Sequence, residues 1–362
     1  MHALVTGGGG FLGGYIVEAL LARGDKVRSF GRKLYPTLEA NGVEVVRGDL
    51  RDGAALAAAC DGIECVFHAA AQPGIGLDRD LYEGVNRTGT EMLLSTARRA
   101  GAARFIYTSS PSVVFAGVDQ RDVNESAPYD FGWMDEHRAY YSHTKASAEQ
   151  AVLAANCNEF RTCSLRPHLI WGPGDTHLIP RLLAQARARR LRRVGDGANL
   201  VDITYVENAA AAHLQAADAM CRSTEPAANR PNEERAEPTD LPAEFVDTPP
   251  PCGLAYFISQ GEPVNCWQWI DDILALVNLP PVRKTISQRS AARIGAACEA
   301  VYGMLGIKPE PPMTRFLAAQ LSTSHWFNIS AAERDFGYRP RVSTVEGMQR
   351  LGEWLRQRDG SS

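Results

Sequence analysis

Residues 3–15, ALVTGGGGFLGGY, decide the fold. An apolar, strand-like run precedes four glycines, and a helical pattern begins at Phe11. Gly7, Gly10 and Gly13 have the spacing of a tight turn that joins a strand to a helix. Glycine at these positions lets a pyrophosphate approach the backbone, where its charge faces the helix N-terminus. The stretch therefore predicts a dinucleotide-binding turn, and the alternative is a plain tight turn.

Downstream of this turn, strand-like runs alternate with helical patterns. The runs are KVRSF, VEVVRGD, ECVFHAA, RFIYTSS and TCSLRPHLI, and LAYFIS follows much later. Because parallel strands need crossover helices, the pattern predicts an α/β fold with a Rossmann-type doubly wound parallel sheet. We expect residues 1–175 to form most of the dinucleotide-binding domain, with returning segments at about 195–220 and 252–260. Residues 176–362 should form most of a smaller C-terminal substrate-binding region.

The composition argues against several classes of protein. The chain has 362 residues, 45% of them apolar and 22% charged, which is typical of globular proteins. A net charge of -4 provides no basic field for nucleic acid. The eight cysteines show no CxxC or Cys/His ligand pattern, so we expect buried thiols in a reducing cytoplasm and no metal. The first residues carry no leader pattern, which also predicts a cytoplasmic protein.

Two longer stretches interrupt the alternation. Residues 222–251 are rich in proline and acidic side chains, and this composition predicts a disordered or loosely attached surface insertion. Residues 111–138 connect a strand to a helix and carry Phe131, Trp133 and Met134. Because long loops in compact domains are often functional, we expect this connection to act as a lid.

The end of the second strand indicates which dinucleotide binds. Many dinucleotide sites have a carboxylate there, which accepts a hydrogen bond from the ribose 2′-hydroxyl. This chain has Arg32 and Lys33 instead. A guanidinium can bind a 2′-phosphate through two hydrogen bonds, so we expect NADP(H) in preference to NAD(H). Asp49, after the third strand, is a candidate acceptor for the adenine amine, and a helix N-cap is its alternative role.

The stretch YYSHTK at residues 140–145 contains a candidate acid/base pair. Side chains four residues apart on a helix share a face, so Tyr141 and Lys145 should lie together while Tyr140 points elsewhere. Reduction of a ketone needs a hydride on carbon and a proton on oxygen. Tyrosine is a poor acid or base near neutral pH, because its pKa is about 10. A lysine ammonium one turn away, together with the positive charge of an oxidised nicotinamide, would lower that pKa, which would explain the pairing with Lys145.

A carbonyl oxygen that gains negative charge needs a second donor. The run RFIYTSS ends in hydroxyls, at the edge where open parallel sheets bind ligands. Ser110 is our choice, with Ser109 and Ser112 as alternatives. Asn86, on the preceding helix, either stabilises a helix bulge or holds a proton-relay water.

A helical pattern from Ser287 carries an apolar stripe. The stripe either packs on the sheet or borders an apolar entrance that touches a membrane or a partner enzyme. Its residues are Ala291, Ile294, Ala297, Cys298, Val301, Met304 and Leu305.

These motifs resemble the extended short-chain dehydrogenase/reductase superfamily, and within it the 3β-hydroxysteroid dehydrogenase branch. The resemblance rests on VTGGGGFLG, RGDL, VNRTGT, FIYTSSPSVVFAG, YYSHTKASAEQ and GDGANLVDITYVENAAAAH. Within that branch, LRPHLIWGPGD, AYFISQGEPV, EPPMTRFLAAQL and RDFGYRP are most similar to the 2-alkyl-3-oxoalkanoate reductases of bacterial long-chain olefin biosynthesis. The match covers residues 1–220 and 252–350.

The resemblance implies roles for individual residues and a homodimer. Tyr141 would be the proton donor and acceptor, Lys145 its partner and ribose ligand, and Ser110 the second carbonyl donor. The residues implied to line the cofactor are Gly7, Gly10, Phe11, Leu12, Gly13, Arg32, Asp49, Leu50, Ala69, Ala70, Tyr141, Lys145 and Pro167.

The function implied by the resemblance is the NADP(H)-dependent interconversion of a 2-alkyl-3-oxoalkanoate and a 2-alkyl-3-hydroxyalkanoate. A 3β-hydroxysteroid or sterol dehydrogenase that uses NAD(P) is the alternative enzyme. A non-catalytic, nicotinamide-sensing scaffold would have a degraded Tyr/Lys pair, and the pair is intact here. Val201 stands where nucleotide-sugar members of the superfamily usually carry arginine. We therefore expect a small hydrophobic acid or a sterol-like substrate rather than a sugar nucleotide.

Overall fold

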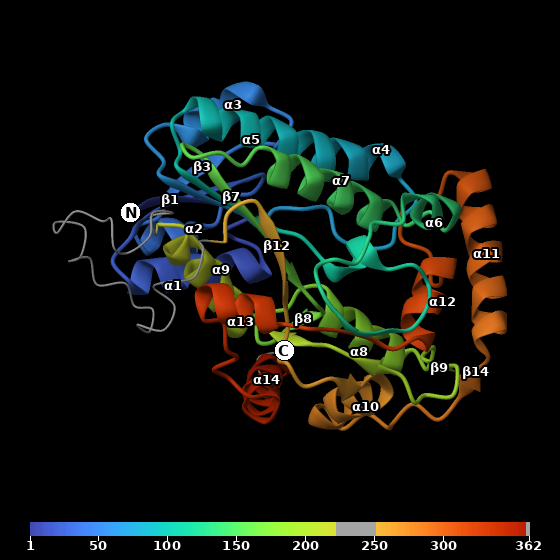
Figure 1. Cartoon of the computed structure of the whole chain (residues 1–362). Helices are drawn as coiled ribbons and strands as arrows, with labels where there is room; N and C mark the ends of the chain where they lie inside the picture. The colour runs from blue at the N-terminus through green and yellow to red at the C-terminus, as the bar shows by residue number, and fades with distance from the viewer. Residues whose placement is uncertain (222–250, 360–362) are drawn as a thin grey trace.

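A parallel sheet of seven strands forms the centre of the computed structural model, which describes residues 1–221 and 251–359 (Figure 1). The strands lie in the order β12-β7-β5-β4-β1-β2-β3, so the order reverses between β1 and β4, as in a doubly wound fold. This confirms the predicted fold class. The strands are β1 (His2–Thr6), β2 (Lys26–Gly31), β3 (Glu44–Arg47), β4 (Cys65–His68), β5 (Arg104–Thr108), β7 (Arg161–Pro167) and β12 (Leu254–Ile258).

Helices cover both faces of this sheet (Figure 1). Successive residues of a strand point to opposite faces, so Ala3 and Val5 lie in one apolar cluster and Leu4 lies in another. Burial on both sides explains why β1 and β4 contain short continuous apolar runs rather than alternating ones. One face carries α1 (Phe11–Ala22) and α9 (Val206–Ala219), and the other carries α3 (Gly53–Cys60), α5 (Gly89–Arg99) and α7 (Tyr140–Ala154).

The later part of the chain builds smaller sheets beyond the carboxyl ends of these strands. A four-stranded sheet has the order β13-β10-β15-β6, β8 pairs with β11, and β9 pairs with β14. The strands are β6 (Gln120–Val123), β8 (Ile170–Trp171), β9 (Arg193–Val194), β10 (Leu200–Val201), β11 (Thr204–Tyr205), β13 (Val264–Asn265), β14 (Thr285–Ile286) and β15 (His325–Phe327). The helices are α8 (Leu178–Arg187), α10 (Cys266–Leu276), α11 (Gln288–Leu305), α12 (Arg315–Ser322), α13 (Ser330–Phe336) and α14 (Thr344–Asp359).

The connection 111–138 is more ordered than a loop. It contains a 3-10 helix (Pro111–Val114), strand β6 and helix α6 (Phe131–Glu136). Strand β6 pairs with β15, and Met134 is fully buried. The pairing strand comes from the far end of the chain, so no local pattern could have revealed it.

Two roles were predicted for the apolar stripe of α11, and the first of them, packing on the sheet, is wrong. Ala291 is buried, but Ile294, Val301, Met304 and Leu305 are exposed. Helix α11 stands at the margin of the molecule beside α12 (Figure 1). None of the helices in the described ranges is both long and apolar enough to cross a membrane.

Two further predictions concern the insertion and the cysteines. The insertion predicted at residues 222–251 lies, except for Pro251, outside the described residues. All eight cysteines are free thiols, but only four of them are buried and Cys221 is exposed, so the predicted burial is wrong for the others.

Candidate active site

The glycine turn leaves the start of α1 open. Gly7 has a φ of +72°, and a Cβ on Gly13 would lie 2.1 Å from the Gly7 carbonyl oxygen. Both positions therefore require glycine. Gly10 is the N-cap of α1, and no side chain among the described residues caps this helix. Its first backbone N–H groups remain available to an anion, so the turn fits the pyrophosphate of a dinucleotide.

A groove opens at this turn, and one aromatic ring covers part of it. Gly9, Gly10 and Phe11 line the groove on one side, and Gly174 lines it on the other. A Cβ on Gly9 would lie 2.1 Å from the ring of Tyr35, so this ring rests directly on the turn. The glycine motif does not include Tyr35, so this contact was not predicted. Tyr35 lies outside the turn, directly before the short helix α2 (Pro36–Ala40).

The acidic candidate for adenine binding is already paired. Both carboxylate oxygens of Asp49 accept hydrogen bonds from the Arg51 guanidinium, at 2.8 and 2.9 Å. The hydrogen bonds from Arg51 lower the pKa of Asp49 to about 2, and the charge of the exposed Arg32 acts in the same direction. Asp52, not Asp49, caps α3 by accepting from the Ala54 and Ala55 N–H groups. The helix-cap alternative for Asp49 is therefore wrong.

The remaining cofactor candidates lie at different depths. The Cα of Ala70 would be 3.1 Å from a Cβ on Gly7, so it adjoins the glycine turn. Ala69 is partly buried beside it, and Pro167 ends β7 at the same edge of the sheet. Leu50 is buried in the apolar cluster that includes α3 and α5.

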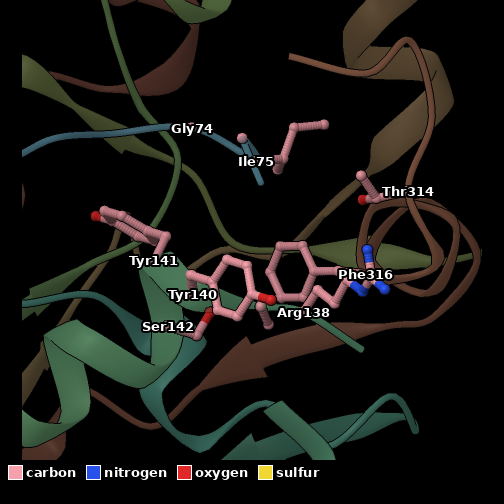
Figure 2. A pocket seen from close by; sticks show the side chains of 10 residues that line it. Gly74, Ile75, Arg138, Tyr140, Tyr141, Ser142, Thr314 and Phe316 are labelled. Carbon is pink, nitrogen blue, oxygen red and sulfur yellow. The ribbon is translucent and has the colours of Figure 1, made fainter. Parts of the chain in front are cut away.

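Tyr141 and Lys145 lie in the first turns of α7, but their hydroxyl and ammonium groups contact different partners. Figure 2 shows that the side chains of Tyr141 and Tyr140 point in different directions. The buried Lys145 ammonium donates to the carbonyl oxygen of Thr108 and lies 4.1 Å from the centre of the Tyr107 ring. The lysine is thus fixed against β5.

Burial shifts the pKa of both groups. It raises the pKa of Tyr141 to about 12, and a hydrogen bond with Ser110 opposes this rise. It lowers the pKa of Lys145 to about 7, opposed by the charge of Glu149. Lys145 alone does not lower the pKa of Tyr141, because burial dominates and the ammonium faces Thr108 and Tyr107. The expectation for the complex with oxidised nicotinamide stays a prediction.

Of the three candidate serines, Ser110 is the one beside Tyr141. Ser110 begins the 3-10 helix at the end of β5, and its oxygen accepts from the Ser112 N–H at 3.2 Å. Its hydrogen bond with Tyr141 brings the two hydroxyls together. Ser109 is buried on the Glu149 side instead.

Asn86 lies within a π-helical turn, Glu83–Thr88, between α4 (Arg79–Tyr82) and α5. Its amide donates to the Gln72 carbonyl oxygen at 3.0 Å and to the Thr144 hydroxyl at 3.3 Å. The bulge thus ties the loop after β4 to α7, next to Lys145. This geometry matches the helix-bulge alternative.

A buried ion pair beneath Lys145 was not predicted. Glu149 accepts from the Arg166 guanidinium at 2.6 Å and from the hydroxyls of Tyr129 and Ser164 at 2.7 and 2.8 Å. The helical period of Tyr141 and Lys145 also reaches Glu149, so this signal was present in the sequence.

A small pocket adjoins the start of α7 (Figure 2). Its walls come from three distant segments: the loop after β4, the residues Arg138 to Ser142, and the start of α12. Thr314 and Phe316 therefore bring the C-terminal part of the chain to the same place as Tyr141.

A glycine turn on a doubly wound sheet, with serine, tyrosine and lysine at its carboxyl edge, defines an oxidoreductase of the short-chain dehydrogenase/reductase class. The model of the 3-beta hydroxysteroid dehydrogenase/isomerase family matches residues 4–281, and the chain belongs to this family. This confirms the predicted family and an enzyme that acts on hydroxyl or keto groups.

Individual relatives cover nearly the whole chain. A 2-alkyl-3-oxoalkanoate reductase of Stenotrophomonas maltophilia is 43% identical over 97% of this chain and 98% of the relative. The mouse sterol-4-alpha-carboxylate 3-dehydrogenase, decarboxylating, is 33% identical over 96% of this chain and 88% of the relative. Among solved structures, the dTDP-glucose 4,6-dehydratase DesIV of Streptomyces venezuelae, with NAD bound, has a TM-score of 0.71 at 22% identity and covers 100% of this chain and 98% of its own. That likeness supports the fold.

Proposed function

We propose that the protein is an NADP(H)-dependent reductase that interconverts a 2-alkyl-3-oxoalkanoate and a 2-alkyl-3-hydroxyalkanoate. The observation that carries this proposal is the 43% identity, along nearly the whole chain, to a bacterial reductase of that name. The sterol enzyme of mouse shares 33%. The substrate would be a small hydrophobic acid, as made in long-chain olefin biosynthesis.

The geometry at the edge of the sheet supports the catalytic roles that we propose. When bound, a nicotinamide would supply or accept the hydride at the β-carbon of the substrate, and its positive charge in the oxidised form would favour the phenolate of Tyr141. Tyr141 would take the hydroxyl proton during oxidation and return it during reduction. Ser110, beside it, would donate to the substrate oxygen as charge develops there. Lys145 would hold the nicotinamide ribose, and Asn86 would position α7.

The choice of NADP(H) rests on the charges at the end of β2. Arg32 is exposed, and no carboxylate occupies the position that usually accepts from a ribose 2′-hydroxyl. A 2′-phosphate would be bound by Arg32, with Lys33 beside it. The glycines at positions 7, 10 and 13, together with Phe11, Leu12 and Ala70, would surround the pyrophosphate.

Val201 and the apolar part of the pocket lining favour a hydrophobic substrate over a sugar nucleotide. Val201 is fully buried and offers no cation to a diphosphate. Phe316 and Ile75 line the pocket beside Tyr141. The homodimer implied by the resemblance and a cytoplasmic location stay predictions.

The test offers the purified protein NADP or NAD with either a 2-alkyl-3-hydroxyalkanoate or a 3β-hydroxysterol, and follows the near-ultraviolet absorbance of reduced nicotinamide. We expect turnover of the branched hydroxy acid with NADP. Turnover of the sterol with NAD alone would refute both the substrate and the role of Arg32. Binding of NADPH without turnover of either substrate would favour a scaffold.

A further inference from the structure

Glu149 is a buried carboxylate that the proposed reaction does not use. It lies on α7 one turn after Lys145, so the two side chains share a face of the helix. Three side chains donate to it: the Arg166 guanidinium at 2.6 Å, and the hydroxyls of Tyr129 and Ser164 at 2.7 and 2.8 Å. These donors come from β7 and from the connection that precedes α7, so the carboxylate is fixed from outside its own helix.

The contacts around Glu149 keep its charge inside the protein. Burial raises the pKa of this carboxyl group, but the Arg166 charge and the hydrogen bonds outweigh burial, so the pKa lies below its usual value. The carboxylate is therefore ionised at neutral pH. A fixed negative charge that is removed from solvent favours a nearby cation, because little water screens the interaction.

Lys145 is buried among groups that carry no negative charge of their own. Its ammonium donates to the Thr108 carbonyl oxygen and lies 4.1 Å from the centre of the Tyr107 ring. Burial raises the pKa of both Tyr107 and Tyr141, so these hydroxyls stay neutral near neutral pH. His68, on β4, is also neutral there, because burial and the Lys145 charge lower its pKa to about 3.

Within the described part of the chain, Glu149 is the one group whose charge favours the Lys145 ammonium. Burial lowers the pKa of Lys145 to about 7, and the charge of Glu149 opposes that fall. The cation on β7 faces the carboxylate instead, since Nε and Nη2 of Arg166 both donate to Glu149. Tyr129 stays neutral, because burial raises its pKa as well. Without Glu149, the ammonium would lose its proton below neutral pH.

The same two side chains of α7 reach consecutive residues at the end of β5. Lys145 donates to Thr108, and the Ser109 hydroxyl faces Glu149. Ser110, which follows directly, has the hydroxyl that meets Tyr141. A change at Glu149 would therefore act both on Lys145 and on the strand end that carries Ser110.

We propose that Glu149 is a positioning residue whose fixed negative charge keeps the buried Lys145 protonated and in place against Thr108. The charge of the lysine does not depend on the proposed function. Its consequence for catalysis rests on that function, because there the ammonium would hold the nicotinamide ribose and favour the Tyr141 phenolate.

The test measures the titration of Lys145 by NMR in the full chain, without substrate or cofactor. The chain has five lysines and the other four are exposed, so labelling their Cε atoms with carbon-13 gives few resonances, and Lys145→Arg identifies the buried one. The variant is Glu149→Gln with Arg166→Met, which removes the carboxylate without leaving the guanidinium unpaired. We expect the midpoint of the Lys145 titration to fall by about one pH unit or more.

Two controls separate the charge of Glu149 from a general loss of packing. Glu299→Gln with Arg315→Met removes another ion pair with a buried carboxylate, between α11 and α12, and should leave the Lys145 midpoint unchanged. Glu149→Asp keeps the negative charge and should shift the midpoint less than the double variant does. Thermal unfolding shows which variants are folded. If the glutamine variant does not fold, Glu149→Leu with Arg166→Met takes its place.

Three outcomes would overturn the proposal: an unchanged Lys145 midpoint in the folded double variant, an equal shift in the Glu299/Arg315 control, or an unmodified protein whose Lys145 loses its proton well below neutral pH. If the protein is the proposed reductase, the pH above which kcat/KM for the branched hydroxy acid falls should move down with the midpoint. A shifted midpoint in a protein that turns over no substrate would support the role of Glu149 and refute the proposed function, so the two failures are distinguishable.

Discussion

Tyr140 and Tyr141 are adjacent in the sequence but have different surroundings. Tyr141 shares a hydrogen bond with Ser110, whereas Tyr140 lies beside Arg138 and Phe316 in the pocket (Figure 2). We expect Tyr141→Phe to lower turnover by about a thousandfold or more and to leave NADPH binding intact. Tyr140→Phe, the matched control, should cost less than about tenfold. If Tyr141→Phe and Tyr140→Phe lowered turnover equally, Tyr141 would not be the residue that transfers the proton.

The ion pair between Glu149 and Arg166 is fully removed from solvent. Glu149→Gln would leave the Arg166 charge buried without its partner, so the free energy of unfolding should fall by about 3–5 kcal/mol. Urea unfolding measures this loss. Replacing both partners by apolar residues, as Glu149→Leu with Arg166→Met, should be less harmful than the single change. If the double variant has the lower free energy of unfolding, the ion pair itself stabilises the protein, beyond the cost of leaving one charge without its partner.

Arg32 is the residue on which cofactor choice depends. Arg32→Ala should lower kcat/KM with NADP by about tenfold or more, because charged hydrogen bonds to the 2′-phosphate are lost. Activity with NAD should change little. Arg98→Ala, on the exposed side of α5, serves as a control for the loss of one positive charge. If kcat/KM fell equally with NADP and with NAD, Arg32 would stabilise the fold rather than bind the 2′-phosphate.

Individual residues were predictable where their chemistry depends on local spacing. The glycine turn, the start of α7 at Tyr140 and the juxtaposition of Ser110 with Tyr141 all follow from short motifs. The direction of the shift in the Tyr141 pKa was not predictable, because it depends on how deeply the rest of the chain buries the hydroxyl. Tyr35 was missed because it lies outside the glycine motif.

At the scale of elements, α11 offers two glycines with opposite expectations. Gly295 packs against the backbone of Thr314, which cannot yield, so Gly295→Ala should destabilise the protein by about 1–3 kcal/mol. Gly303 meets only the flexible end of Arg138 at 3.3 Å, so Gly303→Ala should stabilise it by about 0.5–1 kcal/mol through helix propensity. Thermal unfolding of both variants measures the difference. If both substitutions changed the stability in the same direction, close packing of α11 at Gly295 would not be important for stability.

Elements with strong local patterns were predicted within a few residues. Helix α1 begins at Phe11, and Ser287, where the helical pattern was expected to begin, is the N-cap of α11. Strand β6 was missed because its partner β15 comes from a distant part of the sequence. The π-helical turn at Asn86 depends on hydrogen bonds to Gln72 and Thr144, which periodicity does not report.

At the scale of the whole molecule, Asp202 links the smaller sheets. It lies between β10 and β11, and its carboxylate accepts from the Phe327 N–H of β15 at 2.8 Å. Burial raises the pKa of Asp202 to about 7. The folded protein thus holds a proton that the unfolded chain releases near pH 4, so this group's contribution to stability falls as the pH rises to about 7.

Asp202→Asn should remove that dependence on pH, because an amide oxygen can still accept from Phe327. Above pH 7 we expect the variant to be more stable than the parent by roughly 1–3 kcal/mol. Urea unfolding at a series of pH values measures how the free energy of unfolding changes with pH in the parent and in the variant. Identical slopes between about pH 4 and pH 7 would contradict the assignment.

The way in which the later segments return to the sheet edge was the least predictable feature of the whole molecule. Sequence order predicts the doubly wound sheet, because each crossover is local. The contact of Thr314 and Phe316 with the pocket has no local signal, since it depends on how α11 and α12 pack together.

Strand β12 pairs with β7 at the edge of the sheet, although much of the chain separates them in sequence. During synthesis, Arg161–Pro167 is complete long before Leu254–Ile258 leaves the ribosome. Throughout that interval the outer N–H and C=O groups of β7 lack their final partner, and an open strand edge invites pairing with other chains. A chain interrupted before Leu254 would therefore give an aggregating fragment rather than a smaller domain, and the arrival of β12 protects the nascent protein.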